Sequence, residues 1–413
     1  MISVQNHQQL LSGNKHLLSL LFVALILTAS CSPKTTVPAS KPSGKPGTSL
    51  PPEKPREKNV HSIALLLPFQ LNNINLQTAG KKEISQADLA VDFYQGFKLA
   101  LDSLAAEEGE HFKLQVFDTQ DQETRMVNLA RASSVRDNDL IVGPIFPDGI
   151  QTFGDFADLK FKLQVSPLAA VAPAQFKNPN LVTVTSSIDQ HASKIADFIK
   201  NNYKPAQVNI ILINFKKPED EKFGAPLRKY LQALAAGKFT FTELANATTL
   251  ESSLSPAKTN LVILTSYAKD FVIPAIDKLY KSNQLNVRIQ LFGHPNWAKA
   301  QFLNAEKMQK LNTHITSSYF VNYKDEHTKN FIARYRDSYG FEPSEFAFKG
   351  FDCGYFFGGL LGNYGTDYAD HLKNKTYSGL HNNFRFERDD TSGYRNSNVI
   401  MLEYRDFELQ LTE

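Results

Sequence analysis

The sequence is poor in cysteine, and its most apolar stretch is too short to cross a bilayer. Only two cysteines, Cys31 and Cys353, occur in the 413 residues. Cys353 lies among aromatic residues in a predicted helix, where a buried thiol acts as a small hydrophobic group. The apolar run at residues 17–27 falls well short of the roughly 20 residues that a membrane-spanning helix needs. We therefore expect no internal disulfide and a folded part that depends on its hydrophobic cores.

A strong net charge and catalytic motifs are also missing. The formal net charge is +3, and Lys and Arg are interspersed with Asp and Glu, which argues against a nucleic-acid partner. The sequence has no H-E-x-x-H motif, no Walker loop and no G-x-S-x-G motif. Asp118 and Asp121 bracket a loop after a strand, where solvated turn carboxylates are far commoner than metal ligands. The sequence therefore predicts a protein that is not an enzyme and that has no metal or cofactor.

The first 31 residues have the features of an export signal. A basic start and the apolar run 17–27 lead to small residues and then to Cys31, as in secretory signals. The segment resembles the lipobox of bacterial lipoproteins, although Thr28 stands where that motif usually has leucine. The resemblance implies that Cys31 is lipidated and becomes the mature N-terminus; the alternative is an ordinary cleaved signal with an incidental cysteine. Because Ser32 follows instead of aspartate, lipoprotein sorting signals imply the periplasmic face of the outer membrane.

Residues 32–59 are rich in Pro, Lys, Ser, Thr and Gly. Such a segment cannot bury enough apolar surface to fold. Its prolines favour an extended chain of roughly 3 Å per residue. We expect a flexible linker that holds the folded part away from a membrane.

From residue 60 onward, short apolar runs alternate with segments of helical periodicity. The expected order in the first block is strand 63–67, helix 87–104, strand 113–117, helix 123–135, strand 140–142, helix 153–159 and strand 163–166. The second block is expected to hold an extended segment 181–185, helix 188–201, strand 208–213, helix 223–234, strands 239–241 and 261–264, helix 271–280 and strand 289–292. A return strand 319–323, helices 328–339 and 344–361, and strands 384–386 and 399–404 complete the prediction.

Repeated βα cycles in two blocks predict an α/β fold of two doubly wound parallel-sheet lobes, with a cleft at the carboxyl ends of the strands. We assign residues of about 60–185 and 320–362 to the first lobe. Residues of about 186–319 and 363–413 are assigned to the second lobe. One predicted helix carries small residues at close spacing, which favours close helix packing over a cofactor loop: Gly354, Gly358, Gly359 and Gly362.

Six segments occur in a characteristic order: IALLLP at 63–68, FYQGFKLALD at 93–102, LQVFDTQD at 114–121, LIVGP at 140–144, VSP at 165–167 and YRDSYGFEP at 335–343. This ordered set of motifs resembles the type I periplasmic binding proteins, which include the leucine/isoleucine/valine-binding proteins. The resemblance implies two lobes joined by a multi-strand hinge of three crossovers that close on a ligand. The sequence also resembles a narrower group of Gram-negative lipoproteins with this fold, some of them fused to peptidoglycan-binding LysM domains. No LysM-like repeat is visible here.

The resemblance places the ligand cleft at ten residues of this chain: Phe146, Asp148, Ser166, Leu168, Ala169, Phe223, Tyr267, His294, Asn296 and Trp297. Several polar groups of the amino-acid-binding members are replaced. Pro147 stands near the usual serine, and Phe223 replaces a tyrosine. Since a buried zwitterion needs both charges satisfied, the substitutions disfavour a free amino acid and leave a larger, less charged ligand of unknown identity.

Two questions remain open in the sequence. Trp297, with His294 and Tyr267, forms either an aromatic platform for a ligand or part of the packed core. The protein is either a solute-binding lipoprotein that serves an ABC permease or a regulatory lipoprotein that acts on a peptidoglycan synthase through protein contacts. A sensor that passes ligand occupancy to a partner is a third interpretation. The resemblance places each of them in the cell envelope, held by a lipid anchor.

Overall fold

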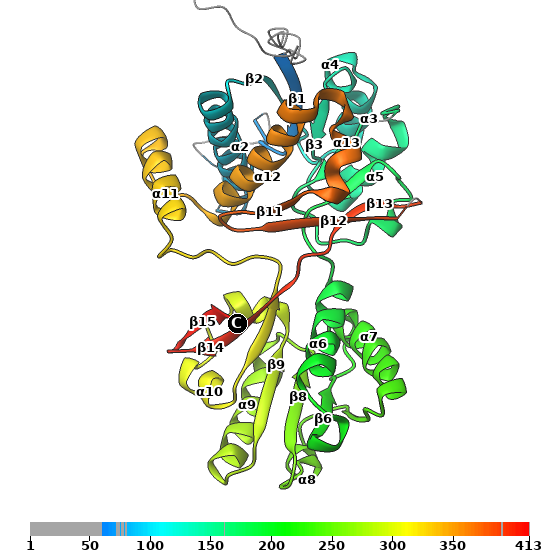
Figure 1. Cartoon of the computed structure of the whole chain (residues 1–413), viewed down its shortest axis with the longest axis vertical. Coiled ribbons are helices and arrows are strands. Elements are labelled where there is room, and N and C mark those ends of the chain that lie inside the picture. Colours follow the sequence, from blue (N-terminus) through cyan, green and yellow to red (C-terminus); the bar gives the residue numbers. More distant parts are fainter. Residues whose placement is uncertain are drawn as a thin grey trace, which may run out of the picture. The chain divides into compact units, whose positions relative to one another are not determined.

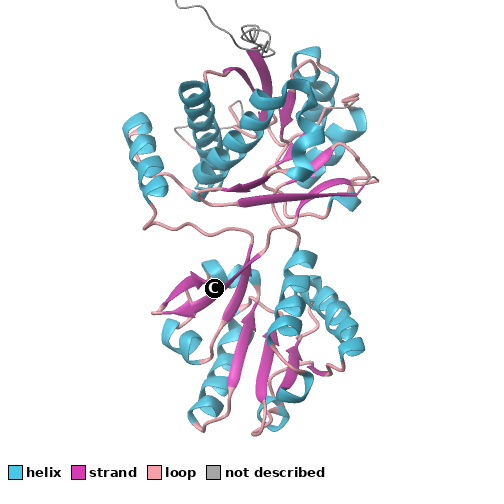
Figure 2. Cartoon of the chain, viewed as in Figure 1, coloured by secondary structure: helices cyan, strands magenta, loops and turns pink. Residues whose placement is uncertain are grey.

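The computed structural model describes residues 60–71, 75, 78, 81–160, 162–389 and 391–412. The predicted export signal, Cys31 and the linker at 32–59 lie outside these residues. The described residues form two α/β lobes, each built on one sheet (Figures 1 and 2). In this part of the chain, no helix is both long enough and apolar enough to cross a membrane.

The first lobe is built on an eight-stranded sheet of order β11-β12-β13-β5-β4-β3-β1-β2. Its strands are β1 (Val60–Leu67), β2 (His111–Asp118), β3 (Leu140–Val142), β4 (Gln164–Ser166), β5 (Leu181–Thr183), β11 (Thr376–Ser378), β12 (Asn383–Asp389) and β13 (Gly393–Asn396). Its helices are α2 (Lys81–Glu108), α3 (Glu123–Arg131), α4 (Ser133–Arg136), α5 (Pro147–Phe156), α11 (Glu326–Tyr339), α12 (Glu345–Tyr364) and α13 (Tyr368–His371), with the 3₁₀ turns η1 (Pro173–Gln175), η5 (Gly365–Asp367) and η6 (Leu372–Asn374).

The second lobe is built on a seven-stranded sheet of order β15-β14-β10-β9-β8-β6-β7. Its strands are β6 (Val208–Ile213), β7 (Phe241–Leu244), β8 (Thr259–Leu264), β9 (Ile289–Gly293), β10 (His314–Ser317), β14 (Ile400–Arg405) and β15 (Glu408–Leu411). Its helices are α6 (Ile188–Asn202), α7 (Pro218–Ala233), α8 (Leu250–Ser253), α9 (Lys269–Gln284) and α10 (Ala305–Lys310), with the 3₁₀ turns η2 (Pro205–Gln207), η3 (Leu234–Gly237) and η4 (Pro295–Lys299).

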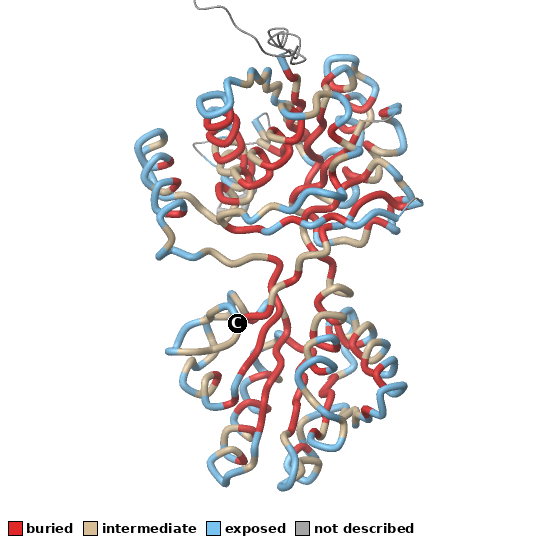
Figure 3. The backbone as a smooth tube through the Cα atoms, in the orientation of Figure 1, coloured by how far each residue is buried: buried red, intermediate tan, exposed pale blue. Residues whose placement is uncertain are grey.

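Each sheet is covered by helices on both faces. In β1, Ile63 and Leu65 pack into the core under α2 and α12, whereas Ala64 and Leu66 pack into the core under α3 and α5. The second sheet has α6 and α7 on one face and α9 and α10 on the other. Figure 3 shows the inner strands of the sheets as buried and the outer sides of the helices as exposed. The predicted doubly wound architecture is thus confirmed, and it explains why strands buried on both faces read as continuous apolar runs.

The C-terminal boundary of the lobes was predicted wrongly. Residues 363–396 belong to the first lobe, because β13 pairs in parallel with β5 and joins Tyr394 to Val182. Phe384 and Phe386 of β12 complete the core of the first lobe. Only β14 and β15 return to the second sheet. A strand pattern indicates that a segment pairs, but it does not indicate which of two sheets the segment joins.

Two local predictions also differ from the structure. The helix expected at 153–159 is α5, which begins at Pro147, because the fixed φ angle of proline suits the first helical position. The return strand expected at 319–323 lies earlier, at β10, whose first residue is His314. Residues 319–323 have an apolar, aromatic pattern, but they connect the two lobes and join neither sheet.

Helices α2 and α12 approach each other closely enough for their backbones to touch, and Figure 1 shows them side by side. A Cβ atom added to Gly350 would lie 2.1 Å from the carbonyl oxygen of Phe93. One added to Gly96 would lie 1.9 Å from the carbonyl oxygen of Ala347. Further along α12, Gly354 packs against Phe97 of α2 and Gly358 packs against Leu101 of α2. The predicted role of Gly354 and Gly358 in close helix packing is confirmed, and Gly350 has the same role.

The carboxylate of Asp352, on α12, is fully buried and joins this helix to the turn between β11 and β12. It accepts hydrogen bonds from the backbone N–H groups of Leu380, His381 and Asn382 at 2.8, 2.9 and 2.7 Å. The hydroxyl of Tyr377 donates a fourth at 3.1 Å. Burial raises the pKa of Asp352 to about 6, and the four donors oppose that rise because they stabilise the charged form.

Trp297 belongs to the core of the second lobe. Its side chain has no exposed surface, and its indole Nε1 donates a hydrogen bond to the carbonyl oxygen of Ser266 at 2.9 Å. The ring packs on Gly293, where an added Cβ atom would lie 2.1 Å from it. Of the two interpretations of Trp297, the structure supports core packing and contradicts a ligand platform that includes this ring.

We expect Trp297→Ala to lower the free energy of unfolding by about 3–5 kcal/mol, because it leaves a large cavity in a packed core. Trp297→Phe keeps most of the packing and loses the indole hydrogen bond, so about 1–2 kcal/mol is expected. Urea unfolding followed by circular dichroism measures both. A loss below about 1 kcal/mol for Trp297→Ala would contradict the buried position.

Asp352 generates a prediction about pH. Because its carboxyl holds a proton up to about pH 6 in the folded protein and up to only about pH 4 when unfolded, it contributes stability at low pH that is lost as the pH rises to 6. The free energy of unfolding of the natural protein, minus that of Asp352→Asn, should therefore fall between these pH values. The slope should not exceed about 1.4 kcal/mol per pH unit. A difference that grows with pH would mean that the four hydrogen bonds lower the pKa of Asp352 by more than burial raises it.

Candidate functional site

In open α/β sheets, ligands bind at the carboxyl ends of the parallel strands. In the second lobe these ends carry the loops that follow β6, β8 and β9. The loop after β8 holds Tyr267, and the loop after β9 holds His294 and Asn296. Phe223 reaches the same place from α7. We call the group of Phe223, Tyr267 and His294 the second-lobe cluster.

His294 is the centre of the second-lobe cluster. Its ring centroid lies 5.1 Å from that of Phe223, in an edge-to-face arrangement, and 5.0 Å from that of Tyr267. His294 is 5% exposed, whereas Tyr267 is 43% exposed. Since Phe223 is fully buried and packs in the core, it supports the imidazole from inside, and Tyr267 presents an aromatic surface to the outside.

The hydrogen bond of His294 determines its tautomer. The backbone N–H of Asn296 donates to Nδ1 at 3.0 Å, so the proton of the neutral ring resides on Nε2. Burial, followed by the nearby His191, lowers the pKa of His294 to about 3. At neutral pH the ring is therefore an uncharged donor. Asn296 contributes through its backbone, and its side chain is exposed.

His191 and Ser318 lie beside this cluster and were not predicted. His191 Nε2 lies 3.2 Å from the hydroxyl oxygen of Ser318. Burial lowers the pKa of His191 to about 4, so this ring is also neutral at neutral pH. His191 comes from α6 and Ser318 from the segment that leaves β10. Nothing in the local sequence joins two residues so far apart, and only the fold brings them together.

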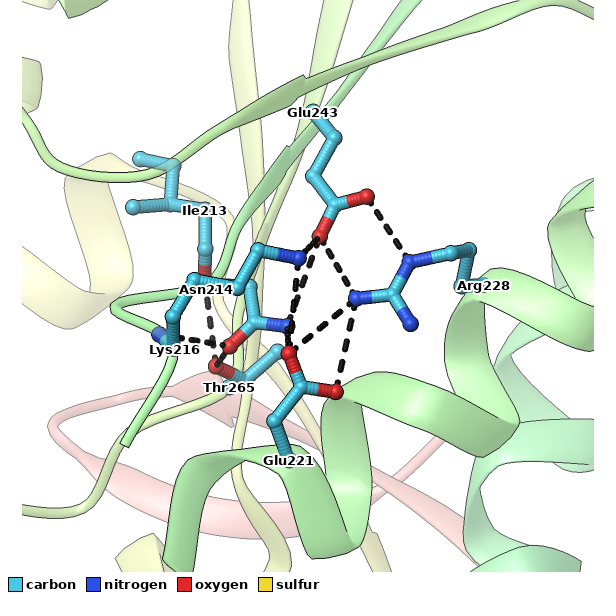
Figure 4. A network of polar contacts seen from close by, with 7 residues as sticks. All are labelled: Ile213, Asn214, Lys216, Glu221, Arg228, Glu243 and Thr265. Carbon is cyan, nitrogen blue, oxygen red and sulfur yellow. Dashed lines mark hydrogen bonds and ion pairs between the residues drawn. The ribbon is translucent and has the colours of Figure 1, made fainter. Parts of the chain in front are cut away.

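A network of charged side chains surrounds the end of β6 (Figure 4). The Arg228 guanidinium donates to both oxygens of Glu243 at 2.8 Å and to Glu221 at 3.2 Å. Lys216 contacts Glu243, and the buried Asn214 donates to Glu221 at 2.9 Å. Arg228 lowers the pKa of Glu243 to about 2. The network fixes the loop before α7, and the spacing of Glu221 and Arg228, two turns apart on that helix, is the signal that could have predicted it.

In the first lobe, the predicted residues lie at the ends of β3 and β4. Phe146 and Leu168 pack against the main core, and Ala169 is buried in a smaller cluster. The hydroxyl of Ser166 is buried and has no hydrogen-bond partner among the described residues. Asp148 is exposed in the first turn of α5. Burial, and then the charge of Asp148, raise the pKa of Asp121, so two carboxyl groups lie near each other at this edge.

Two of the three crossovers between the lobes are tied to each other, and the remaining one is tied to the turn between β11 and β12 of the first lobe. The hydroxyl of Ser186 donates to the carbonyl oxygen of Asn398 at 3.1 Å, and the side-chain amide of Gln190 donates to the backbone carbonyl oxygen of Asn396 at 2.7 Å. The backbone N–H of Phe320 donates to the carbonyl oxygen of His381 at 3.0 Å. The multi-strand hinge implied by the resemblance is therefore confirmed, and His191 with Ser318 lies next to it.

Similar folds occur among solved structures of low sequence identity. A protein of Rhodospirillum rubrum described as a branched-chain amino acid ABC transporter is 13% identical, with a TM-score of 0.63 over 86% of this chain and 100% of that one. An ABC transporter substrate-binding protein of Desulfitobacterium hafniense, solved in complex with Leu, is 14% identical, with a TM-score of 0.53 over 86% of this chain and 100% of that one.

LpoA of Haemophilus influenzae has the same fold over part of its length. It is 15% identical, with a TM-score of 0.57, and the match covers 86% of this chain and 60% of LpoA. No curated protein sequence matches the chain. The sequence model of the periplasmic binding protein family matches residues 85–397. Since that match covers well over half of the chain, the protein belongs to the periplasmic binding protein family.

Proposed function

We propose that the protein is a solute-binding lipoprotein that closes its two lobes on a small polar ligand and presents it to an ABC permease. Cys31 would carry the lipid, residues 32–59 would be the linker, and the protein would face the periplasm from the outer membrane. Family membership supports the binding role. The observation that carries the proposal is the neutral Nε2 donor of His294 beside the exposed ring of Tyr267, at the strand ends where this fold class binds ligands.

The charges around the second-lobe cluster favour a ligand without a full zwitterion. Arg228 and Lys216 are paired with Glu221 and Glu243, and His294 is neutral. A ligand carboxylate would therefore not find Arg228 or Lys216 as a free cation. Hydrogen bonds from Nε2 and contact with an aromatic ring suit a ligand of moderate polarity. A free amino acid is therefore disfavoured.

A regulatory lipoprotein that acts on a peptidoglycan synthase is the second candidate. Pro147 stands near the position where amino-acid-binding members carry a ligand-binding serine, and Leu168 lies in the loop that normally supplies a threonine. Leu168 and the neighbouring Phe146 pack against the core instead. A cleft with such an apolar edge could be vestigial, and the lobes would then act through their outer surfaces.

Native mass spectrometry of the purified protein tests the first candidate. We expect a small molecule that is retained under native conditions and lost on denaturation, and its mass would guide identification. A protein that keeps no small molecule, and whose unfolding temperature is unaffected by amino acids, peptides, sugars or cell-wall fragments, would favour the second candidate.

Once a ligand is known, Tyr267→Ala should weaken its binding by about 1–2 kcal/mol through the loss of aromatic contact. Phe407→Ala is the matched control. It removes an aromatic side chain that is 63% exposed at the turn between β14 and β15, which form one edge of the same sheet, whereas Tyr267 follows the interior strand β8. Isothermal titration calorimetry should show a loss for Tyr267→Ala alone; equal losses in both variants would argue against the second-lobe cluster as the binding site.

A further inference from the structure

A groove lies beside α11 and is not lined by Tyr267 or His294. It has a volume of about 900 Å³ and is lined mainly by α2, α11, α12, β11 and the hinge segment after β10, with Ile400 of β14 and Leu411 of β15 at one side. Its size is that of a small-molecule site. Because Tyr267 and His294 do not line it, it needs an occupant other than the solute of the proposed function.

A row of aromatic rings lines the groove. Phe351 and Tyr355 have centroids 5.8 Å apart and planes inclined by 21°, and Tyr355 and Tyr377 are 6.2 Å apart at 28°. Rings at these separations are offset, so each leaves part of its face uncovered. Phe331 is the last ring of the row, and its centroid lies 4.8 Å from that of Phe351. Phe351, Tyr355 and Tyr377 are half-buried, which gives an apolar surface that a ligand can reach.

Hydrogen bonds hold the tyrosines of this row in place. The Tyr355 hydroxyl donates to Glu107, on α2, at 2.8 Å. The Tyr377 hydroxyl donates to the buried Asp352 at 3.1 Å. The aromatic surface is therefore formed before any ligand arrives, which lowers the entropic cost of binding.

The border of the groove carries charged groups of both signs, among them Asp325, Arg334 and Asp337, together with neutral hydrogen-bonding groups. Asn330, Ser378 and Asn383 are exposed and line it, and amides and hydroxyls both donate and accept hydrogen bonds. The Arg334 guanidinium donates a hydrogen bond to the hydroxyl of Ser103 at 2.9 Å. The carboxylate of Glu107 accepts the hydrogen bond from the Tyr355 hydroxyl. A ligand that fits here combines a flat apolar face with hydroxyl groups around its edge.

Sugar rings have this chemistry, because their C–H groups pack on aromatic faces while their hydroxyls bind amides. We propose that the groove between α11, α12 and β11 is a second binding site, and that its ligand is a neutral oligosaccharide. The ring of Tyr355 would carry one sugar residue, and Asn330 and Asn383 would bind hydroxyl groups at its edge.

Isothermal titration of the full-length protein with cellotriose, maltotriose and chitotriose tests the proposal. At least one of the three should bind. Tyr355→Ala should weaken that binding at least about tenfold, as loss of a stacked aromatic ring does, whereas Tyr355→Phe should change it by less than about threefold because the ring remains. If none of the three binds, the proposal is wrong.

Two further variants keep the test independent of folding and of the proposed function. Asn330→Ala, on the exposed side of α11, should leave the unfolding temperature unchanged and weaken the saccharide by about two- to tenfold. Tyr267→Ala should leave saccharide binding intact. Loss of binding in Tyr267→Ala but not in Tyr355→Ala would place the saccharide at the second-lobe cluster and overturn the second site, while the solute-binding proposal would stand.

Discussion

The close approach of α2 and α12 is the contact on which the hinge side of the first lobe depends. Gly96 and Gly350 allow the two backbones to touch, which fixes α12 over the sheet. Asp352 is thereby fixed as well, and its carboxylate orders the turn that includes His381. The carbonyl oxygen of His381 then receives the backbone N–H of Phe320. A helix contact made possible by the absence of side chains thus holds a crossover between the lobes in place.

The interlaced path of the chain has a consequence for folding. The first sheet lacks β11, β12 and β13 until the chain has passed through the second lobe and returned. The parallel pairing of β13 with β5 joins residues on either side of the whole second lobe. Such contacts between distant segments cost loop-closure entropy before they contribute stability. The first lobe can therefore complete its sheet only after the hinge segments have come together, so lobe and hinge form as one unit.

Local pattern predicted most of the fold, because strands buried on both faces and amphipathic helices leave clear periodicities. The run at 63–67 and the glycines of α12 were interpreted correctly for this reason. The pattern failed where the choice was between distant partners, as for Phe384 and Phe386, whose sheet was assigned wrongly. At the site, Tyr267 and His294 were predicted to lie together, and they do so.

Other features of the site could not be predicted from the sequence. The burial of Trp297 and the pairing of His191 with Ser318 depend on the packing of segments that the sequence keeps far apart. The roles of Trp297, His191 and Ser318 depend on which side chains contact one another in the folded protein. The periodicity of residues within one segment does not indicate such contacts between segments.

The electrostatics of the second lobe limit how a ligand could drive closure. A ligand shifts the equilibrium between open and closed lobes only by its differential affinity for the two states. Arg228 and Lys216 are already paired with glutamates, and His191 and His294 are neutral at neutral pH. Charge pairing between a ligand and these four side chains therefore contributes little to the difference in affinity. Hydrogen bonds and aromatic contacts remain, and both act only at short range. Closure would therefore select a ligand by its shape and by the placement of its polar groups rather than by its net charge.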